Sequence, residues 1–517
     1  MATRHTGLMP LVALVWGLAA GQGQAQGAPL SAIDWLSDTV AAPVRRTDPE
    51  PPSTPPGEVP AIVTTPLADR NLDAVGLLPV AVTGLDHGLW AASSTATLIG
   101  LIAAERPEPL PALRDLLQTL LLAELAPPAD ADGTGAFLLA RVDKLLELGA
   151  LEAAAALVDA AGPPDADLFR RSFDIALLLG TEDAACAEQR AAPGIAPTFP
   201  ARIFCLARGG DWPAAELTLR TAQALGQIGP QDLAMMERFI APELYEDEAP
   251  LPPPDRLSPL VLRIFEAIGE PVSSTGLPLA FAHGDLTPAT GWKGRLEAGE
   301  RLARGGAIAP GLLFELYSER IPAASGGVWT RVEAVQRFET ALAAGDPGAV
   351  AASLPRVWAA LADRELEVPF AEVHAAALAR LPLTGETRAL AFRIALLGPD
   401  YETAALAHAP ATPDEAFLSG LARGNLTVPP PPDGLARAIA PVFATSGTAP
   451  PVSPQAMVLL DSGRAGEAAL LAIDKITTGA TGDFRGVTEG LALLRRLGLE
   501  GVARKAALQL IVLERRG

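Results

Sequence analysis

The apolar positions of the chain follow a helical pattern from about residue 93 nearly to the end. Leucine and alanine recur at spacings of three and four residues, which places them on one face of a helix. Glycine, proline and Asp, Ser or Thr residues separate these stretches and are typical helix stop and start signals. The clearest predicted helices cover residues 110–125, 136–148, 150–161, 212–225, 328–344, 350–362 and 502–513. Because the connections are short, we expect consecutive helices to be antiparallel neighbours.

A glycine-centred turn recurs between the predicted helices. Gly149, Gly209, Gly463 and Gly498 are each followed by alanine five residues later and by leucine or alanine eight residues later. We expect each glycine to end a helix in the left-handed conformation. The small alanine then lets the next helix approach closely, and the eighth residue, such as Leu217, fills the seam.

This turn and the spacing of 35 residues between Gly463 and Gly498 resemble the tetratricopeptide repeat, whose period is about 34 residues. The resemblance implies helical hairpins that stack side by side. We therefore predict an all-α fold of stacked antiparallel helical hairpins, a TPR-like α-solenoid, with a small irregular N-terminal cap.

Composition divides the chain into segments. Two proline-rich runs, Pro250–Pro254 and Val428–Pro432, mark changes between helical stretches; they are either module boundaries or rigid connectors inside one continuous superhelix. The predicted segments are a signal peptide (1–25), a short amphipathic segment (26–41), a proline-rich linker (42–60), an irregular cap (61–92) and three helical-repeat modules (93–249, 250–428 and 429–517).

The beginning of the chain has the features of a signal peptide. Arg4 precedes the apolar run Leu11–Ala20, and Gly23 and Ala25 supply small residues for cleavage. A run of ten residues is too short to span a bilayer, which takes about 20 residues. We therefore expect a periplasmic protein that is not inserted in the membrane after signal cleavage.

Charge and cysteine content narrow the function classes. The net charge of −20 argues against nucleic-acid binding and against attachment to anionic lipids. Cys186 and Cys205 are the only cysteines. In an oxidising compartment we expect them to form a disulfide across the connection 192–200, clipping two successive helices together, rather than to remain as two buried thiols.

The segment 26–41 carries Ile33, Trp35 and Leu36, ahead of a linker that proline keeps extended. Two interpretations remain open. The segment is a tethered peptide that docks on a partner, or Trp35 packs against the body of its own protein.

The sequence contains few signs of catalysis. Metal-binding, phosphate-loop, dinucleotide and nucleophile-elbow motifs are all missing, so we expect no cofactor. The densest group of polar and aromatic residues lies at 275–340, and we interpret it as packing or a partner-binding surface. An acid–base site around His283, or a glycosidase-like pair of Asp285 and Glu300, is the alternative. The candidate partner-binding residues are Ile33, Trp35, Leu36, Trp292, Arg301, Tyr317, Arg320, Trp329 and Arg337.

The last 23 residues are locally basic on an acidic chain. The basic residues are Arg495, Arg496, Arg504, Lys505, Arg515 and Arg516. They either mediate self-association, by contacting the acidic face of another copy, or form the solvated face of a terminal repeat.

Several segments resemble a group of exported, alanine-rich proteins of Gram-negative bacteria labelled "antifreeze glycopeptide polyprotein". The similar stretches are IDWLS at 33–37 and the segments 201–226, 291–308 and 325–339. The resemblance implies export and a helical fold, and it assigns no catalytic residue. We expect a non-catalytic scaffold or adaptor for a protein or peptide of the cell envelope. The alternatives are a cell-wall enzyme of the lytic-transglycosylase kind, although its Glu-Ser motif is missing, and a subunit that assembles end to end.

Overall fold

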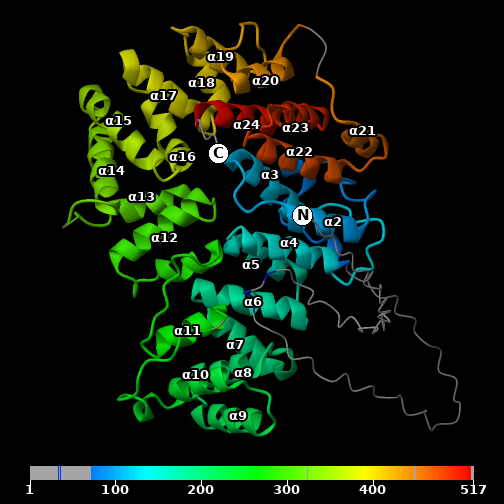
Figure 1. Ribbon diagram of the computed structural model, residues 1–517, viewed down its shortest axis with the longest axis vertical. Helices are drawn as coiled ribbons and strands as arrows, with labels where there is room; N and C mark the ends of the chain where they lie inside the picture. The colour runs from blue at the N-terminus through cyan, green and yellow to red at the C-terminus, as the bar shows by residue number, and fades with distance from the viewer. Residues whose placement is uncertain are drawn as a thin grey trace, which may run out of the picture.

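The computed structural model of the protein (Figure 1) describes residues 33, 35, 36, 71–254, 256–322, 324–446 and 450–513. Every regular element in these ranges is a helix, so the predicted all-α class is confirmed. The predicted signal peptide, the proline-rich linker and most of the segment 26–41 lie outside the described residues. In the described ranges, no helix combines the length and the apolar character that crossing a membrane requires.

The helices agree with the sequence pattern to within three residues at either end of each predicted helix. Short 3-10 helices are η1 Leu72–Ala74, η2 Pro193–Ile195, η3 Pro242–Leu244 and η4 Leu279–Leu286. The first α-helices are α1 Val80–Thr83, α2 Thr95–Ala104, α3 Pro111–Leu122, α4 Ala136–Glu147, α5 Leu151–Ala161, α6 Ala166–Leu179, α7 Glu182–Ala191, α8 Phe199–Arg208, α9 Trp212–Ala224, α10 Pro230–Ile240, α11 Pro259–Ala267 and α12 Trp292–Arg304. The others are α13 Pro310–Ser318, α14 Val328–Ala343, α15 Pro347–Ala362, α16 Glu367–Leu378, α17 Gly385–Leu397, α18 Tyr401–Ala407, α19 Pro413–Ala422, α20 Gly434–Phe443, α21 Pro454–Asp461, α22 Ala465–Gly479, α23 Phe484–Arg496 and α24 Glu500–Val512.

The glycine turns form as expected at three of the four positions. Gly149, Gly463 and Gly498 have φ values of 71°, 72° and 79°, in the left-handed region. At the fourth turn the prediction is wrong by one residue, because Gly210 takes the left-handed conformation (φ 81°) and Gly209 stays helical. Leu217 is consequently 67% exposed instead of filling the seam. Either of two adjacent glycines can adopt a positive φ, so the pattern alone did not set the register.

The two ends of the described chain pack together. Helix α24 contacts α3, and α22 contacts both α2 and α3 (Figure 1). The buried side chain of Gln509 in α24 accepts a hydrogen bond from the Ala112 N–H of α3 at 2.9 Å. A superhelix in which each hairpin touches only its neighbours does not describe these contacts.

The C-terminal helix α24 is enclosed rather than exposed. It contacts α3, α17, α19, α20 and α23, and Ala503, Ala506, Ala507 and Leu508 are fully buried. The small alanine side chains let several helices approach α24 at once. The basic residues Arg504 and Lys505 of α24 are half-buried and Arg496 of α23 is exposed, so the interpretation of this basic region as the solvated face of a terminal repeat stays a prediction.

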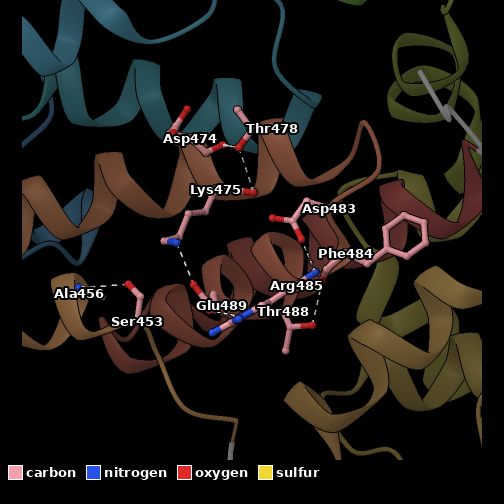
Figure 2. Close-up of polar contacts among 10 residues, drawn as sticks. All are labelled: Ser453, Ala456, Asp474, Lys475, Thr478, Asp483, Phe484, Arg485, Thr488 and Glu489. Carbon is pink, nitrogen blue, oxygen red and sulfur yellow. Dashed lines mark hydrogen bonds and ion pairs between the residues drawn. The ribbon is translucent and has the colours of Figure 1, made fainter.

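Helices α22 and α23 approach each other closely at glycine residues. A Cβ atom added at Gly490 would lie 2.6 Å from a side-chain carbon of Ile476, and one at Gly479 would lie 2.7 Å from the Val487 backbone nitrogen. Polar contacts flank this seam (Figure 2). Lys475 of α22 donates to Glu489 of α23 at 2.8 Å, and Arg485 donates to the same carboxylate at 3.0 Å.

The buried apolar side chains form several groups. The largest joins helices from both ends of the chain, a second lies among α12–α17, and a third lies among α6–α11. The connection Pro250–Pro254 falls within the third group, because α11 packs back on α6. Helices α8–α10 form the end of the molecule farthest from α19 and α20 (Figure 1).

The predicted disulfide between Cys186 and Cys205 is confirmed. It links α7 to α8 with a Cα–Cα distance of 5.0 Å. Both cysteines are buried, and the bond lies among the apolar side chains of the α6–α11 group.

Candidate functional site

The polar cluster at 275–340 contains a buried ion pair. Arg331 of α14 donates to both carboxylate oxygens of Glu300 in α12, at 2.7 and 2.6 Å, and the Tyr317 hydroxyl donates to one of them at 2.8 Å. Burial opposes the charged form of Arg331, but its hydrogen bonds with Glu300 raise the pKa of the guanidinium. Burial and the charge of Glu300 raise the pKa of Tyr317 well above its usual value. Both Glu300 oxygens are therefore engaged in joining α12, α13 and α14.

Some aromatic and arginine residues of this cluster pack between helices, and others lie exposed on the surface. The rings of Trp292 and Trp329 lie 4.9 Å apart, and the Trp292 indole N–H donates to the Leu316 carbonyl at 2.8 Å. Both tryptophans are half-buried and join α12, α13 and α14. Arg320 and Arg337 are exposed and pair with carboxylates close to them in the sequence.

The remaining members of the cluster hold loops in place. Arg301 donates to the Ser274 and Leu277 carbonyls at 3.0 and 2.8 Å. The Ser274 hydroxyl donates to Asp285. His283 shares a hydrogen bond of 2.8 Å with the Gly149 carbonyl, and burial lowers its pKa. These contacts fix η4 and the loop before it against α12 and the turn between α4 and α5.

The N-terminal residues Ile33, Trp35 and Leu36 pack on the body of the protein. Trp35 is 8% exposed and Leu36 is 1% exposed. The Trp35 and Phe281 rings are 5.3 Å apart, edge to face, and Arg256 donates to the Leu36 carbonyl at 2.7 Å. The structure therefore agrees with the interpretation in which Trp35 packs against the body of its own protein.

Three adjacent cavities lie around the end of α12, and Arg301 and Arg304 line all three. Cavity 1 has a volume of about 580 Å³ and lies between α2, α4, the residues 277–279 and the N-terminal segment. Cavity 2, of about 270 Å³, lies between the α2–α3 connection, α12 and α22. Cavity 3, of about 480 Å³, is lined by α12 and the residues 273–275, and Asp285 and Glu300 both face it.

Cavity 1 combines apolar walls with a charged rim. Ile33, Trp35, Ile99 and Leu279 are among its apolar lining residues. Two of its charged residues are already engaged: Asp143 accepts two hydrogen bonds from the fully buried Arg171, and Lys144 donates to the backbone at the end of α2 and to Glu147. Arg304 keeps 41% of its side chain exposed, and its guanidinium lies 3.6 Å from the carboxylate of Glu108. The cation most available to a ligand is therefore Arg304.

Sequence reasoning identified some of these residues and missed others. It selected Ile33, Trp35 and Arg301, which line cavity 1 together. It did not select Arg304 or Lys144, nor the cavity 2 residues Arg106, Arg114 and Thr477. Arg304 carried a weak signal, since it lies three residues after Arg301 on one helix. No local signal marks the others, because distant segments bring them together.

Within the described ranges, no group of three or more His, Cys, Asp or Glu residues is arranged to hold a metal ion. Comparison with known proteins does not assign a family. No protein-family model matches the chain, and neither the curated proteins nor the solved structures contain a match.

Proposed function

We propose that this protein is a non-catalytic scaffold or adaptor of the cell envelope that binds an extended peptide of a partner protein. The peptide would place an apolar side chain in cavity 1 and an acidic side chain or its terminal carboxylate against Arg304. The observation that carries the proposal is the sharing of Arg301 and Arg304 by three cavities, the first of which has largely apolar walls.

The dimensions and chemistry of cavity 1 support this assignment. Its volume of about 580 Å³ lies within the range of ligand sites, roughly 300–1,000 Å³, and such sites combine apolar walls with a few polar groups. A partly exposed arginine beside an apolar pocket suits a carboxylate next to an aliphatic or aromatic side chain. The N-terminal residues Ile33 and Trp35 form part of this wall, so a peptide in cavity 1 would contact the N-terminal segment as well as α2 and α4.

The proposed binding can be tested with displayed peptides. A random peptide library is selected on the mature protein, and the enriched peptides are then measured by fluorescence anisotropy. We expect enrichment of peptides with an apolar residue near an acidic one. Arg304→Glu should weaken their binding about tenfold or more, because it reverses the charge facing the ligand.

Arg337→Glu is the matched control, since Arg337 is exposed on α14 and lines none of the three cavities. Unchanged binding by Arg304→Glu together with a loss in Arg337→Glu would place the interface on the outer face of α14. If the selection enriches no peptide, the adaptor proposal is contradicted.

A second candidate is a cell-wall hydrolase, because Asp285 and Glu300 line one cavity. The two hydrogen bonds from Arg331 and the one from Tyr317 leave Glu300 poorly suited to donate a proton, which favours the adaptor. Release of soluble fragments from purified peptidoglycan, lost in both Glu300→Gln and Asp285→Asn, would support the hydrolase instead.

The same proposal includes a fold of stacked helical hairpins, a periplasmic location and a relationship to the exported alanine-rich group. Self-association through the basic C-terminal region is a further hypothesis. Arg515 and Arg516 lie outside the described residues, whereas Arg495 and Arg504 form ion pairs with Glu500. Light scattering at low and high salt would test it, since contacts between charged surfaces weaken as salt increases.

A further inference from the structure

Cavity 2 lies where segments from three parts of the chain meet. Residues 106–111 lead into α3, Arg301–Gly305 end α12, and Thr477–Thr481 end α22. Figure 1 shows α3, α12 and α22 in different colours because they are far apart in the sequence. A ligand bound here would contact the N-terminal, central and C-terminal parts at once.

The charge of this cavity is opposite to that of the chain. Its charged lining residues are Arg106, Arg114, Arg301, Arg304, Glu108 and Glu365, an excess of two positive charges on a protein of net charge −20. Within the described ranges Arg106 forms no ion pair, and Arg304 has only the 3.6 Å contact with the exposed Glu108. Burial, opposed by Asp285 and reinforced by the charge of Arg304, lowers the pKa of Arg301. Arginines that repel one another in this way favour an anion between them.

Two buried donors of the cavity lack a hydrogen-bond acceptor. The Arg114 side chain is only 9% exposed; its Nη1 donates to the Arg304 carbonyl at 2.9 Å and its Nη2 contacts Asp115, but its Nε has no partner. The Thr477 hydroxyl is also buried without a partner. An unsatisfied buried donor costs about 1–3 kcal/mol, so a small shift of either side chain that brings its donor to a bound acceptor oxygen would be favourable.

We propose that cavity 2 binds a phosphate group, either as inorganic phosphate or as part of a phosphate monoester. The excess of two positive charges matches a dianion and thus favours phosphate over a carboxylate. Guanidinium and hydroxyl donors are common partners of phosphate oxygens. The bound group would tie α3, α12 and α22 together and stabilise the closed arrangement of the chain. This site shares Arg301 and Arg304 with the proposed peptide site and differs from it at Arg106 and Thr477, which line cavity 2 and neither cavity 1 nor cavity 3.

The test measures the thermal unfolding of the full mature chain at constant ionic strength and pH 7.5, with sodium chloride replaced stepwise by inorganic phosphate, by glycerol phosphate or by acetate. We expect a saturable rise in Tm with at least one of the two phosphate compounds, since a ligand of the folded state stabilises it by mass action. The compound with the lower half-saturation concentration identifies the source. Acetate should give no such rise.

The double variant Arg106→Ala with Thr477→Val removes one exposed cation and one hydroxyl, and the exchange of threonine for valine keeps the side-chain volume nearly constant. It should raise the half-saturation concentration about tenfold or more. Arg320→Ala is the control, since Arg320 is 65% exposed and lies away from the cavity. An equal rise with acetate, no rise with either phosphate compound, or an unchanged response in the double variant would overturn the proposal. Because the double variant leaves cavity 1 intact, retained peptide binding separates the fate of this site from that of the proposed function.

Discussion

At the scale of single residues, buried charged groups connect helices that are distant in the sequence. Arg171 of α6 is fully buried and donates two hydrogen bonds to Asp143 of α4. Arg331 of α14 forms the same kind of bidentate ion pair with Glu300 of α12. Removing one member of such a pair leaves the other charge buried and uncompensated, which costs more than the pair contributes to stability.

Arg331→Leu should therefore lower the free energy of unfolding by about 3–5 kcal/mol. The double variant Arg331→Leu with Glu300→Leu should recover most of that loss, because no buried charge remains. Urea denaturation of each variant measures the change. Arg337→Leu on the same helix is the control and should change stability by less than about 0.5 kcal/mol, since its ion pair with Glu333 is exposed. Equal losses at both positions would contradict this account.

Glu105 should make stability depend on pH. Burial raises its pKa from 4.5 to about 8, with a further contribution from Asp474 and an opposing one from Lys144. Asp474 projects from the side of α22 opposite to Lys475 (Figure 2). Because the folded pKa is the higher one, the folded protein binds more protons between pH 4.5 and 8. Stability contributed by the protonated group is thus lost as the pH rises through this window.

Glu105→Gln should remove this pH dependence and stabilise the protein at pH 8.5 on the order of a few kcal/mol. Urea denaturation at pH 5 and at pH 8.5 makes the comparison. Glu108→Gln, three residues away with 81% of its side chain exposed, should behave like the unmodified protein. A pH profile that is identical in Glu105→Gln and the unmodified chain would show that another group causes the dependence.

At the scale of elements, helices pair through small residues at their seams and through one covalent link. Gly479 and Gly490 bring α22 and α23 together, and the disulfide joins α7 to α8. Helices α6–α11 form the arm that contains the disulfide, and this arm has its own apolar group, which includes Phe173, Phe204 and Met236. This arrangement lets the stability of the arm be altered separately.

Replacing Cys186 and Cys205 by alanine should destabilise α7 and α8 by about 3 kcal/mol, because the bond restricts a loop of 19 residues in the unfolded chain. Hydrogen exchange should show the loss of protection in the arm first, with α22–α24 retaining theirs. The reduced unmodified protein should behave like the variant. Uniform loss across the whole chain would mean that the arm does not unfold separately.

At the scale of the whole molecule, the two ends of the described chain share one apolar core. Gly466 at the start of α22 lies against Trp90, and a Cβ atom there would be 2.3 Å from the indole ring. The Gly466 N–H also donates to the Leu89 carbonyl at 3.0 Å. Separation of these segments would expose buried leucines on both sides, so we expect them to unfold together.

Gly466→Ala should destabilise the protein, because the added methyl group forces α22 away from Trp90. Hydrogen exchange should show reduced protection in both α3 and α24, although the substitution lies in neither helix. Gly100→Ala in α2 is the control: its Cβ meets no atom within 4 Å, and alanine favours a helix by about 1 kcal/mol over glycine. Reduced protection confined to α22 would contradict the shared core.

The sequence by itself determined the helices, their approximate ends and the disulfide. Apolar spacing and glycine or proline stop signals act locally, so the pattern predicted α3, α4, α9 and α14 within three residues. It failed at Gly209 and Gly210, where two adjacent residues could each provide the turn. The chain has no other cysteine, and the two lie on successive helices, so their pairing could also be predicted from the local sequence.

Only the tertiary structure decided the closure of the chain and the composition of the cavities. The contact between α3 and α24 joins residues such as Ala112 and Gln509, and no pattern within either helix marks the other as its partner. The same holds for Arg106, Arg301 and Thr477, which line one cavity from three distant segments. Apolar burial is non-directional and depends on area, so many arrangements of these amphipathic helices satisfy the same local pattern. Shape complementarity at small residues such as Gly466 selects among them.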